Sequence, residues 1–374
     1  MIEDENCSAQ HKRVVVKLGT STLTDGQPGL SLPRMADLVR QMSALIENGC
    51  ELILVSSGAI ASGREHLNFP HFPKAMPAKQ MLAAVGQPHL MDRWGQLFGI
   101  YSLAVAQVLL TREDLRSRRR YLNARNTLLA LLGQGILPII NENDTVATEE
   151  IRVGDNDNLS ALVANLIDAD LLILLTDQDG LFTADPRLDP SARIVGLVDT
   201  PEIAPALWAA AGGSGEQGVG GMITKLQAAD LARRSGAGVV IAAGAAPEIL
   251  PRIAASEAVG TRFTPTVSAV ESRKRFILSG GENGALIVDQ GAAQALQHGS
   301  SLLPAGLQQV RGEFGRGESV TVCTADGRQI ARGLVDYCAQ DCMKLCGCHS
   351  DEIEIRLGHF YGDEIIHRNN LVLL

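Results

Sequence analysis

The stretch VVVKLGTS, residues 14–21, places three apolar β-branched residues before a lysine and a glycine. Such a run predicts a short buried strand that ends in a turn. Amphipathic helical stretches separate it from five further apolar runs, at residues 52–55, 105–110, 136–140, 171–175 and 239–242. Because buried strands that alternate with helices are typical of parallel sheets, the sequence predicts an α/β fold with helices on both faces of a parallel sheet.

The composition is that of a folded protein with more than one core. A chain of 374 residues favours about two domains. Hydrophobic residues make up 45% and charged residues 20% of the chain, which is unlike a disordered protein. The net charge of −9 would repel a phosphate backbone, so nucleic acid is not an expected partner.

The beginning of the chain, MIEDENCSAQHKR, is polar and lacks the apolar segment of a secretory signal. No apolar run approaches the roughly 20 residues that span a bilayer. We therefore expect a cytoplasmic protein that does not bind membranes. Seven cysteines, an odd number at scattered positions, argue against a disulfide framework.

The pattern changes in the last third of the chain. The stretch TRFTPTVSAVESRKR, residues 261–275, has no strong periodicity and is interpreted as a linker. After it come short strands, two of which are joined by Asp326 and Gly327, a pair typical of a hairpin. We expect a main domain over residues 9–268, a linker over 269–280 and a smaller, mostly β domain over 281–374.

Glycines and polar residues follow the predicted strands, where ligands bind in parallel α/β folds. The stretch VGDNDN crowds Asp155, Asn156, Asp157 and Asn158 before a helical pattern, although one cap, Asp157 or Asn158, is enough to begin a helix. The other side chains either form a solvated turn or face a ligand that carries an amine. The spacing does not match a calcium-binding EF-hand loop. Asn141 and Asp144, after another strand, could converge on the same place.

A glycine-rich segment, GGSGEQGVGGMITK at residues 212–225, opens a predicted helix. Bare backbone N–H groups at a helix N-terminus bind anions, so the segment is either a phosphate loop of a type other than Walker or a surface loop. Lys17 and Lys225 lie beside glycine turns. They would either contact the same anion or be solvated lysines.

A cluster of cysteines and a run of arginines are interpreted as structural features rather than functional sites. Cys338, Cys342 and Cys346 are spaced as a helical stripe beside Cys348 and His349, not as the paired cysteines of zinc modules. We interpret them as small buried side chains or thiols without a role, and expect no metal site formed by the protein. The stretch RSRRR, residues 116–120, is interpreted as a solvated helix face or a salt-bridged subunit surface.

At this point the sequence resembles the glutamate 5-kinase family along nearly the whole main domain. The similar segments are VVVKLGTS, LVSSGAIASGREHL, KQMLAAVGQ, LLTRED, LNARNT, INENDTVAT, VGDNDNLSALVA, LLTDQDGLFTADPR and GGMITKLQAAD. SRKRFILSG, GSSLLPAG and FGRGE resemble the C-terminal PUA domain of that family. INENDTV followed by VGDNDN separates it from aspartokinases, acetylglutamate kinases and UMP kinases.

The resemblance implies a three-layer α/β/α amino-acid kinase fold with a PUA domain. It also implies ATP and Mg²⁺ as co-substrates, L-glutamate as acceptor and the first step of proline synthesis. Feedback inhibition by proline, a homo-oligomer and hand-over of the product to glutamyl phosphate reductase are further implications. Mg²⁺ is expected mainly on the ATP phosphates.

The resemblance also implies roles for individual residues. Lys17 matches a phosphate-contacting lysine, whereas Ser57, Asp144 and Asn156 match glutamate-binding residues. Nucleotide-binding roles are expected for Gly19, Thr176, Asp177, Val219, Gly220, Gly221, Met222, Ile223, Thr224 and Lys225. Val219 and Ile223 depart from the family, which often has hydroxyl side chains there, so any hydroxyl contact would be lost.

These residues give a hypothesis for catalysis. Lys17 and Lys225 would stabilise the transferring phosphoryl group with backbone N–H groups near Gly19, Gly58 and Gly221, and Asp157 would hold both lysines. The remaining side chains would bind the substrate. Asp144 and, more weakly, Asp155 would face its ammonium group. Its carboxylates would be oriented by Ser57, Asn141 and Asn156.

Two alternatives stay open. Another carboxylate or carbamate kinase could share the fold. The PUA-like domain could also act on RNA, but residues 281–374 hold 12 acidic residues against 7 lysines and arginines. A regulatory or assembly role therefore suits this domain better than RNA binding.

Overall fold

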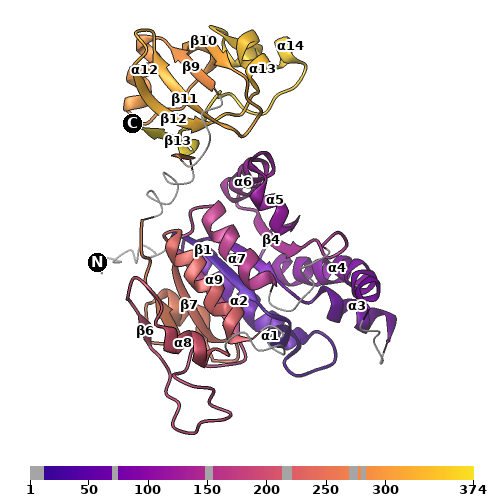
Figure 1. Ribbon diagram of the computed structural model, residues 1–374. Coiled ribbons are helices and arrows are strands. Elements are labelled where there is room, and N and C mark those ends of the chain that lie inside the picture. The colour runs from indigo at the N-terminus through magenta and orange to yellow at the C-terminus, as the bar shows by residue number, and fades with distance from the viewer. Residues whose placement is uncertain (1–11, 70–74, 148–154, 213–220, 269–276, 279–283) are drawn as a thin grey trace, which may run out of the picture. The chain divides into compact units, whose positions relative to one another are not determined.

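The computed structural model describes residues 12–69, 75–147, 155–212, 221–268, 277–278 and 284–374. The chain divides into two units, each with its own sheet (Figure 1). The first comprises Met1–Glu113 and Arg125–Ala269, and the second comprises Asp114–Ala124 and Val270–Leu374. The domain limits expected at residues 268 and 281 adjoin or fall in stretches outside the described residues and stay predictions.

The first unit is built on an eight-stranded sheet. Its strands, in spatial order, are β3 (Val105–Leu110), β4 (Leu137–Glu142), β2 (Glu51–Ser56), β1 (Arg13–Leu18), β5 (Leu171–Thr176), β7 (Gly238–Ala243), β8 (Thr261–Phe263) and β6 (Leu197–Val198). All neighbouring pairs are parallel except β7 and β8. The predicted parallel sheet is confirmed.

One part of the linker interpretation is wrong. Residues 261–263 form β8, which pairs antiparallel with β7 through Ile241 opposite Thr261 and Val239 opposite Phe263. A strand of three residues is too short to show an alternating pattern in the sequence. The sheet therefore continues past the point where the sequence loses its periodicity.

Alternation along β1 decides which side chains face the site. Val14, Val16 and Leu18 belong to the apolar cluster that contains Leu38 and Met42 of α2 (Leu32–Glu47). Successive side chains of a strand point to opposite faces, so Lys17 projects to the other face of the sheet. There it contacts α7 (Asp155–Leu166).

Helices cover both faces of this sheet, as the sequence predicts. Those of the first unit, besides α2 and α7, are α1 (Thr20–Thr24), α3 (Ala59–Leu67), α4 (Met76–Gly99), α8 (Pro205–Ala210), α9 (Met222–Arg234) and α10 (Ile249–Ala254). The limits of the units along the chain fall within α5 (Arg112–Arg116) and α6 (Arg118–Gly133). The stretch RSRRR spans the break between α5 and α6, so its arginines are divided between two helices, and Arg120 pairs with Asp114 at 2.8 Å.

The helix that carries the acidic and amide cluster begins earlier than predicted. α7 starts at Asp155, so Asp157 and Asn158 lie within its first turn and neither caps it. The positive end of the helix dipole favours carboxylates in this turn. Asp157 is therefore free of the capping role and available to the groups that lie across from it.

Helices α3 and α4 pack unusually close together (Figure 1). A Cβ atom on Gly86 of α4 would lie 1.8 Å from the carbonyl oxygen of Ala59, and one on Gly63 of α3 would lie 2.1 Å from that of Leu82. Only glycine permits such contact between two backbones. This contact fixes the position of α4 and of Gln87, the residue after Gly86.

The second unit contains a five-stranded sheet in the order β10 (Leu307–Gly312), β9 (Gly284–Val288), β11 (Ser319–Thr324), β12 (Gln329–Leu334) and β13 (Leu371–Leu373). Strands β11 and β12 pair antiparallel, which confirms the hairpin expected at Asp326 and Gly327. Helices and 3-10 turns flank the sheet, namely α12 (Gln290–Gln297), η1 (Pro304–Gly306), α13 (Ala339–Leu345), η2 (Ser350–Glu352), α14 (Ile353–Leu357) and η3 (Arg368–Asn370). The mostly β character of this unit is confirmed.

The contact between α3 and α4 yields a stability prediction. Gly86→Ala should lower the free energy of unfolding by about 1–3 kcal/mol or more, because the two helices must separate to admit the methyl group. Gly95→Ala, in the same helix, is the matched control, since its Cβ would meet only Val105 Cγ2 at 3.8 Å. The control should be neutral or stabilising by up to about 1 kcal/mol. Urea unfolding checks both variants, and equal effects would contradict the close contact.

Candidate active site

Four neighbouring parallel strands bring the predicted site residues to one edge of the sheet. In the order β4, β2, β1 and β5, they supply Asn141, Ser57, Lys17 and Thr176 at or just beyond their carboxyl ends. The register places Lys17 beside Val55 of β2. Because these strands are parallel, their ends meet at the same edge.

At this edge a single carboxylate bridges two buried lysines. Lys17 Nζ lies 2.5 Å from Asp157 Oδ1, and Lys225 Nζ lies 3.4 Å from Asp157 Oδ2. The Lys17 and Asp157 side chains are 6% and 1% exposed. We call Lys17, Asp157 and Lys225 the lysine–aspartate triad. Its two positive charges exceed its one negative charge, so it would attract an anion.

The ionisation of the triad follows from burial and charge together. Burial raises the pKa of Asp157, but the charges of Lys17 and Lys225 and hydrogen bonds from Lys17 and Thr224 outweigh it and hold this pKa below its usual value. Thr224 donates its hydroxyl to Asp157 Oδ2 at 2.7 Å. Burial lowers the pKa of Lys17 despite the opposing charge of Asp157. The carboxylate is thus ionised at neutral pH.

A chain of amides lies directly beside the triad. Asn156, next to Asp157 on α7, donates Nδ2 to Ser57 Oγ and to Asn141 Oδ1, both at 2.9 Å. Asn141 in turn donates Nδ2 to Gln87 Oε1 at 2.8 Å. We call Gln87, Asn141, Asn156 and Ser57 the amide chain. Neutral hydrogen-bonding groups of this kind orient carboxylates without adding charge.

Asp144 differs from the triad because no cation neutralises it within the described residues. Burial raises the pKa of its carboxyl group to about 6. An ammonium group placed beside it would restore its usual ionisation. Among the described side chains, no hydrogen bond or ion pair joins Asp144 to Ser57, Asn141 or Asn156.

The structure describes most, but not all, of the predicted nucleotide-binding residues. Thr176 Oγ1 donates to Asp177 Oδ1 at 3.0 Å directly after β5. Gly221 precedes α9, and Met222, Ile223, Thr224 and Lys225 form its first turn. Gly19 precedes α1, close to Lys17 Nζ. Val219, Gly220 and the side chain of Asp155 lie outside the described residues.

Comparison with known proteins gives consistent matches over both units. The amino acid kinase family model matches residues 12–243, and the PUA domain model matches residues 284–357. A glutamate 5-kinase of Shewanella amazonensis is 55% identical over 373 residues, with 99% of this chain and 98% of that protein covered. A glutamate 5-kinase of Deinococcus radiodurans is 53% identical over 364 residues, with 97% and 100% covered.

The chain belongs to the glutamate 5-kinase family. It is accordingly a phosphotransferase of the amino acid kinase class with a C-terminal PUA domain. A solved structure, the UMP kinase of Bacillus anthracis, is 16% identical with a TM-score of 0.47, covering 69% of this chain and 97% of that one. Among the described helices none is both long and apolar enough to cross a bilayer.

One residue of the site was not predicted although its segment was. Gln87 lies in KQMLAAVGQ, part of the resemblance to the glutamate 5-kinase family, but no role was predicted for it. Its side chain reaches the site only because α4 packs closely on α3. The available signal was Gly86 just before it, although Gly95 in the same helix shows that a glycine inside a helix need not mark a close backbone contact.

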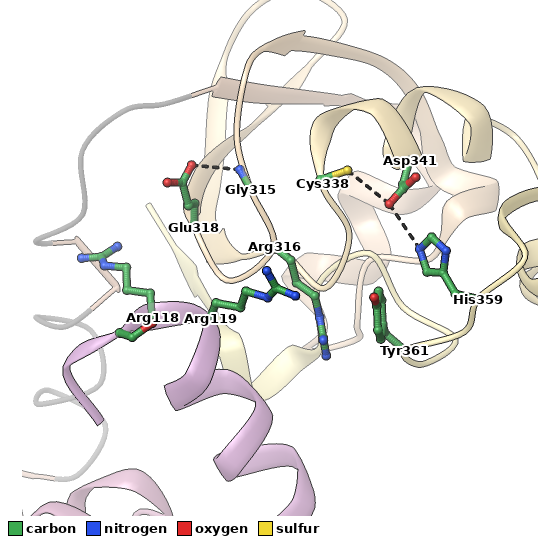
Figure 2. Close-up of a pocket in the computed structure, with 10 residues that line it drawn as sticks. Arg118, Arg119, Gly315, Arg316, Glu318, Cys338, Asp341, His359 and Tyr361 are labelled. Carbon is green, nitrogen blue, oxygen red and sulfur yellow. Dashed lines mark hydrogen bonds and ion pairs between the residues drawn. The ribbon is translucent and has the colours of Figure 1, made fainter. Parts of the chain in front are cut away.

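The PUA unit of this glutamate 5-kinase family member holds the cysteine cluster. Cys342 is the cysteine within α13, whereas Cys338 and Cys346 cap its two ends, so the expected helical stripe runs beyond the helix. Cys338 donates its thiol to Asp341 Oδ2 at 3.1 Å, and His359 Nε2 lies 3.3 Å from the same oxygen (Figure 2). In the described part of the chain, no three His, Cys, Asp or Glu residues are grouped to hold a metal ion.

The triad yields a second stability prediction. Asp157→Asn should lower the free energy of unfolding at pH 7 by about 3–5 kcal/mol, because two buried ammonium groups lose their counter-charge. This loss should shrink as the pH falls below about 4, since Asp157 is then protonated in the unfolded wild-type chain and its lowered native pKa no longer stabilises the fold. Urea unfolding over this pH range measures both effects.

The control for this prediction is Asp185→Asn. Asp185 pairs with Arg187 at 2.8 Å on the surface, and the arginine side chain is 78% exposed. Removing such a pair should change the unfolding midpoint little. A loss for Asp157→Asn as small as that of the control would show that the triad does not stabilise the fold.

Proposed function

We propose that the protein transfers the γ-phosphoryl group of ATP to the γ-carboxylate of L-glutamate, which gives L-glutamyl 5-phosphate in the first step of proline biosynthesis. The observation that carries this proposal is the adjacency of Asn156 and Asp157 on one turn of α7. Through Asp157 the turn meets two cations, and through Asn156 it meets the amide chain. An anionic phosphate and a polar amino acid would thus bind side by side. Relatives that share 53–55% of the sequence are glutamate 5-kinases.

The chemistry requires positive charge more than a base. The γ-carboxylate of glutamate, with an ordinary pKa of about 4.3, is ionised at pH 7 and is already a nucleophile. Its approach to an anionic phosphate is repelled, so the enzyme must align the two groups and stabilise charge on the transferring oxygens. Lys17 and Lys225 supply that charge, and the N-terminus of α9 with Gly221 supplies backbone N–H groups.

The substrate side is assigned to the remaining groups. Asp144 would bind the α-ammonium group, which would favour its ionised form despite its raised pKa. Ser57, Asn141 and Asn156 would orient the carboxylates. Asp155 precedes this cluster on α7 and is assigned a weaker role toward the ammonium. Thr176, Asp177 and the glycine-loop residues 219–225 would hold the nucleotide.

Mg²⁺ fits this site as a companion of the nucleotide. Asp157, the buried carboxylate at the centre, is already engaged by two ammonium groups and a hydroxyl. The protein therefore leaves the metal to the ATP phosphates, where it would neutralise negative charge. The chain's own residues bind and align the two substrates.

Proline is proposed as an inhibitor because it carries the same α-carboxylate and ammonium arrangement that Asp144 and the amide chain would bind. We also propose a cytoplasmic location, a homo-oligomer and hand-over of the labile product to glutamyl phosphate reductase. These proposals rest on membership of the glutamate 5-kinase family.

An ATP-consumption assay with several acceptors tests the function. We expect turnover with L-glutamate and inhibition by proline. Aspartate, which is too short, and acetylglutamate, which lacks the ammonium group, should show little turnover. Trapping the product with hydroxylamine would identify an acyl phosphate. Preference for an acceptor other than glutamate would assign the chain to a different carboxylate kinase activity.

The cationic role of Lys225 gives a kinetic prediction. Lys225→Ala should lower kcat by at least about 100-fold, because a charge aimed at the transition state is lost, while the KM for glutamate stays within a few fold. Arg234→Ala, at the far end of the same helix, removes a cation that pairs with Asp230 at 2.9 Å and should leave kcat unchanged. Steady-state kinetics of the purified variants measures both. A near-normal kcat for Lys225→Ala would show that Lys225 does not stabilise the transferring phosphoryl group.

The raised pKa of Asp144 gives a pH prediction. Because only the ionised carboxylate would bind the ammonium group, kcat/KM for glutamate at saturating ATP should fall about tenfold per pH unit below pH 6. Asp144→Asn should raise the KM for glutamate strongly and abolish this limb of the profile. If the limb persists in the variant, another group titrates there and the ammonium binds elsewhere.

A further inference from the structure

We propose that Gln87 is a positioning residue which, through Asn141 and Asn156, holds the Ser57 hydroxyl as a hydrogen-bond donor toward a carboxylate of the substrate. The inference rests on the proposed function, because it takes Ser57 as a carboxylate-binding residue. The amide chain carries it: three consecutive hydrogen bonds of 2.8–2.9 Å join Gln87 to Ser57 across two other side chains.

The direction of the chain is set by a group that can only donate. The backbone N–H of Glu142 lies 2.9 Å from one end of the Asn141 amide and 3.3 Å from one end of the Asn156 amide. Both of those ends must be oxygen, since an N–H group donates to an acceptor. The other end of each amide is therefore the NH₂ group, so neither asparagine can be turned around without losing this bond.

That direction decides what Ser57 offers to a ligand. Asn156 Nδ2 donates to Ser57 Oγ, so the hydroxyl accepts on this side and keeps its own proton. In the described part of the chain that proton has no acceptor side chain. The backbone N–H of Ser57 donates to the Leu18 carbonyl at 3.0 Å, which fixes the residue at the end of the sheet. A carboxylate beside Ser57 would receive the hydroxyl proton.

Gln87 completes the chain at its other end. The NH₂ group of Asn141 points to Gln87 Oε1, and both side chains are buried, at 3% and 9% exposed. A buried NH₂ group without an acceptor is unfavourable, so the loss of this oxygen would leave Asn141 held only at its oxygen end and free to shift toward another partner. Asn156, which donates to Asn141 Oδ1, would then no longer have a neighbour held in one position. Gln87 is itself held in place by the contact of Gly86 with α3.

The test compares two variants and their combination in the full-length enzyme. Gln87→Met keeps the length of the side chain and removes the amide acceptor. We expect the KM for glutamate to rise at least fivefold, with the KM for ATP within twofold of wild type. Gln96→Met, the same change on an exposed turn of the same helix, should alter neither constant. A role limited to packing would change the unfolding midpoint without this separation of the two KM values.

The double variant shows whether Gln87 acts through Ser57. Ser57→Ala should raise the KM for glutamate, and adding Gln87→Met to it should change that KM by less than twofold, because the hydroxyl to be oriented is gone. The inference would be overturned if Gln87→Met raised the KM for glutamate by the full fivefold in the Ser57→Ala background. It would also be overturned if Gln87→Met left this KM unchanged in the wild-type background. In both cases the proposed function would stand. No effect of Ser57→Ala itself would instead remove Ser57 from the proposed glutamate site, and the inference would fail with it.

A second variant guards against misfolding. If Gln87→Met does not fold, Gln87→Asn serves in its place, because it keeps the amide but withdraws it from Asn141 by one methylene group. The same rise in the KM for glutamate and the same non-additivity with Ser57→Ala are expected. Their absence in a folded Gln87→Asn protein would count against the proposal.

Discussion

The arrangement of this site depends on one buried carboxylate that serves two ammonium groups. Removing charged groups from water is costly, and the cost is offset only when each charge finds a partner at short range. Asp157 meets this need for Lys17 on β1 and Lys225 on α9, so a strand and two helices are joined at one point. The excess of one positive charge is what suits the same point to a phosphate group. The interaction that joins these elements is therefore also the one that prepares the site.

In the proposed site, neutral groups beside this charged centre would recognise the amino acid. Asn156 and Asp157 are consecutive on α7, so the hydrogen-bonding groups and the charged groups of the proposed site adjoin on one helical turn. The neutral and the charged groups would act differently for a physical reason. Amides and hydroxyls have fixed donors and acceptors and select by direction, whereas the lysines act over a longer range and stabilise whatever negative charge develops between them.

Much of the fold and part of the site could be predicted from the sequence. The central strands follow from apolar runs, and Lys17 was found because it directly follows one of them. The cap of α7 was predicted wrongly because polar residues at a helix start look alike whether they cap the helix or lie in its first turn. Strand β8 is too short to show a period. Gln87 was missed because its role depends on how closely two helices pack, which a linear pattern does not record.

The glycine contact between α3 and α4 has a mechanical consequence for recognition. Ser57 lies directly before Gly58, the N-cap of α3, and Gln87 follows Gly86 on α4, so the two ends of the amide chain adjoin the same closely packed pair of helices. The middle of the chain, Asn141 and Asn156, belongs to the sheet and to α7. A shift of α4 along α3 would stretch the hydrogen bond between Gln87 and Asn141 while Ser57 stayed held to the sheet by its backbone bond to Leu18. In the proposed site, the binding of the acceptor would therefore depend on how closely α4 packs against α3.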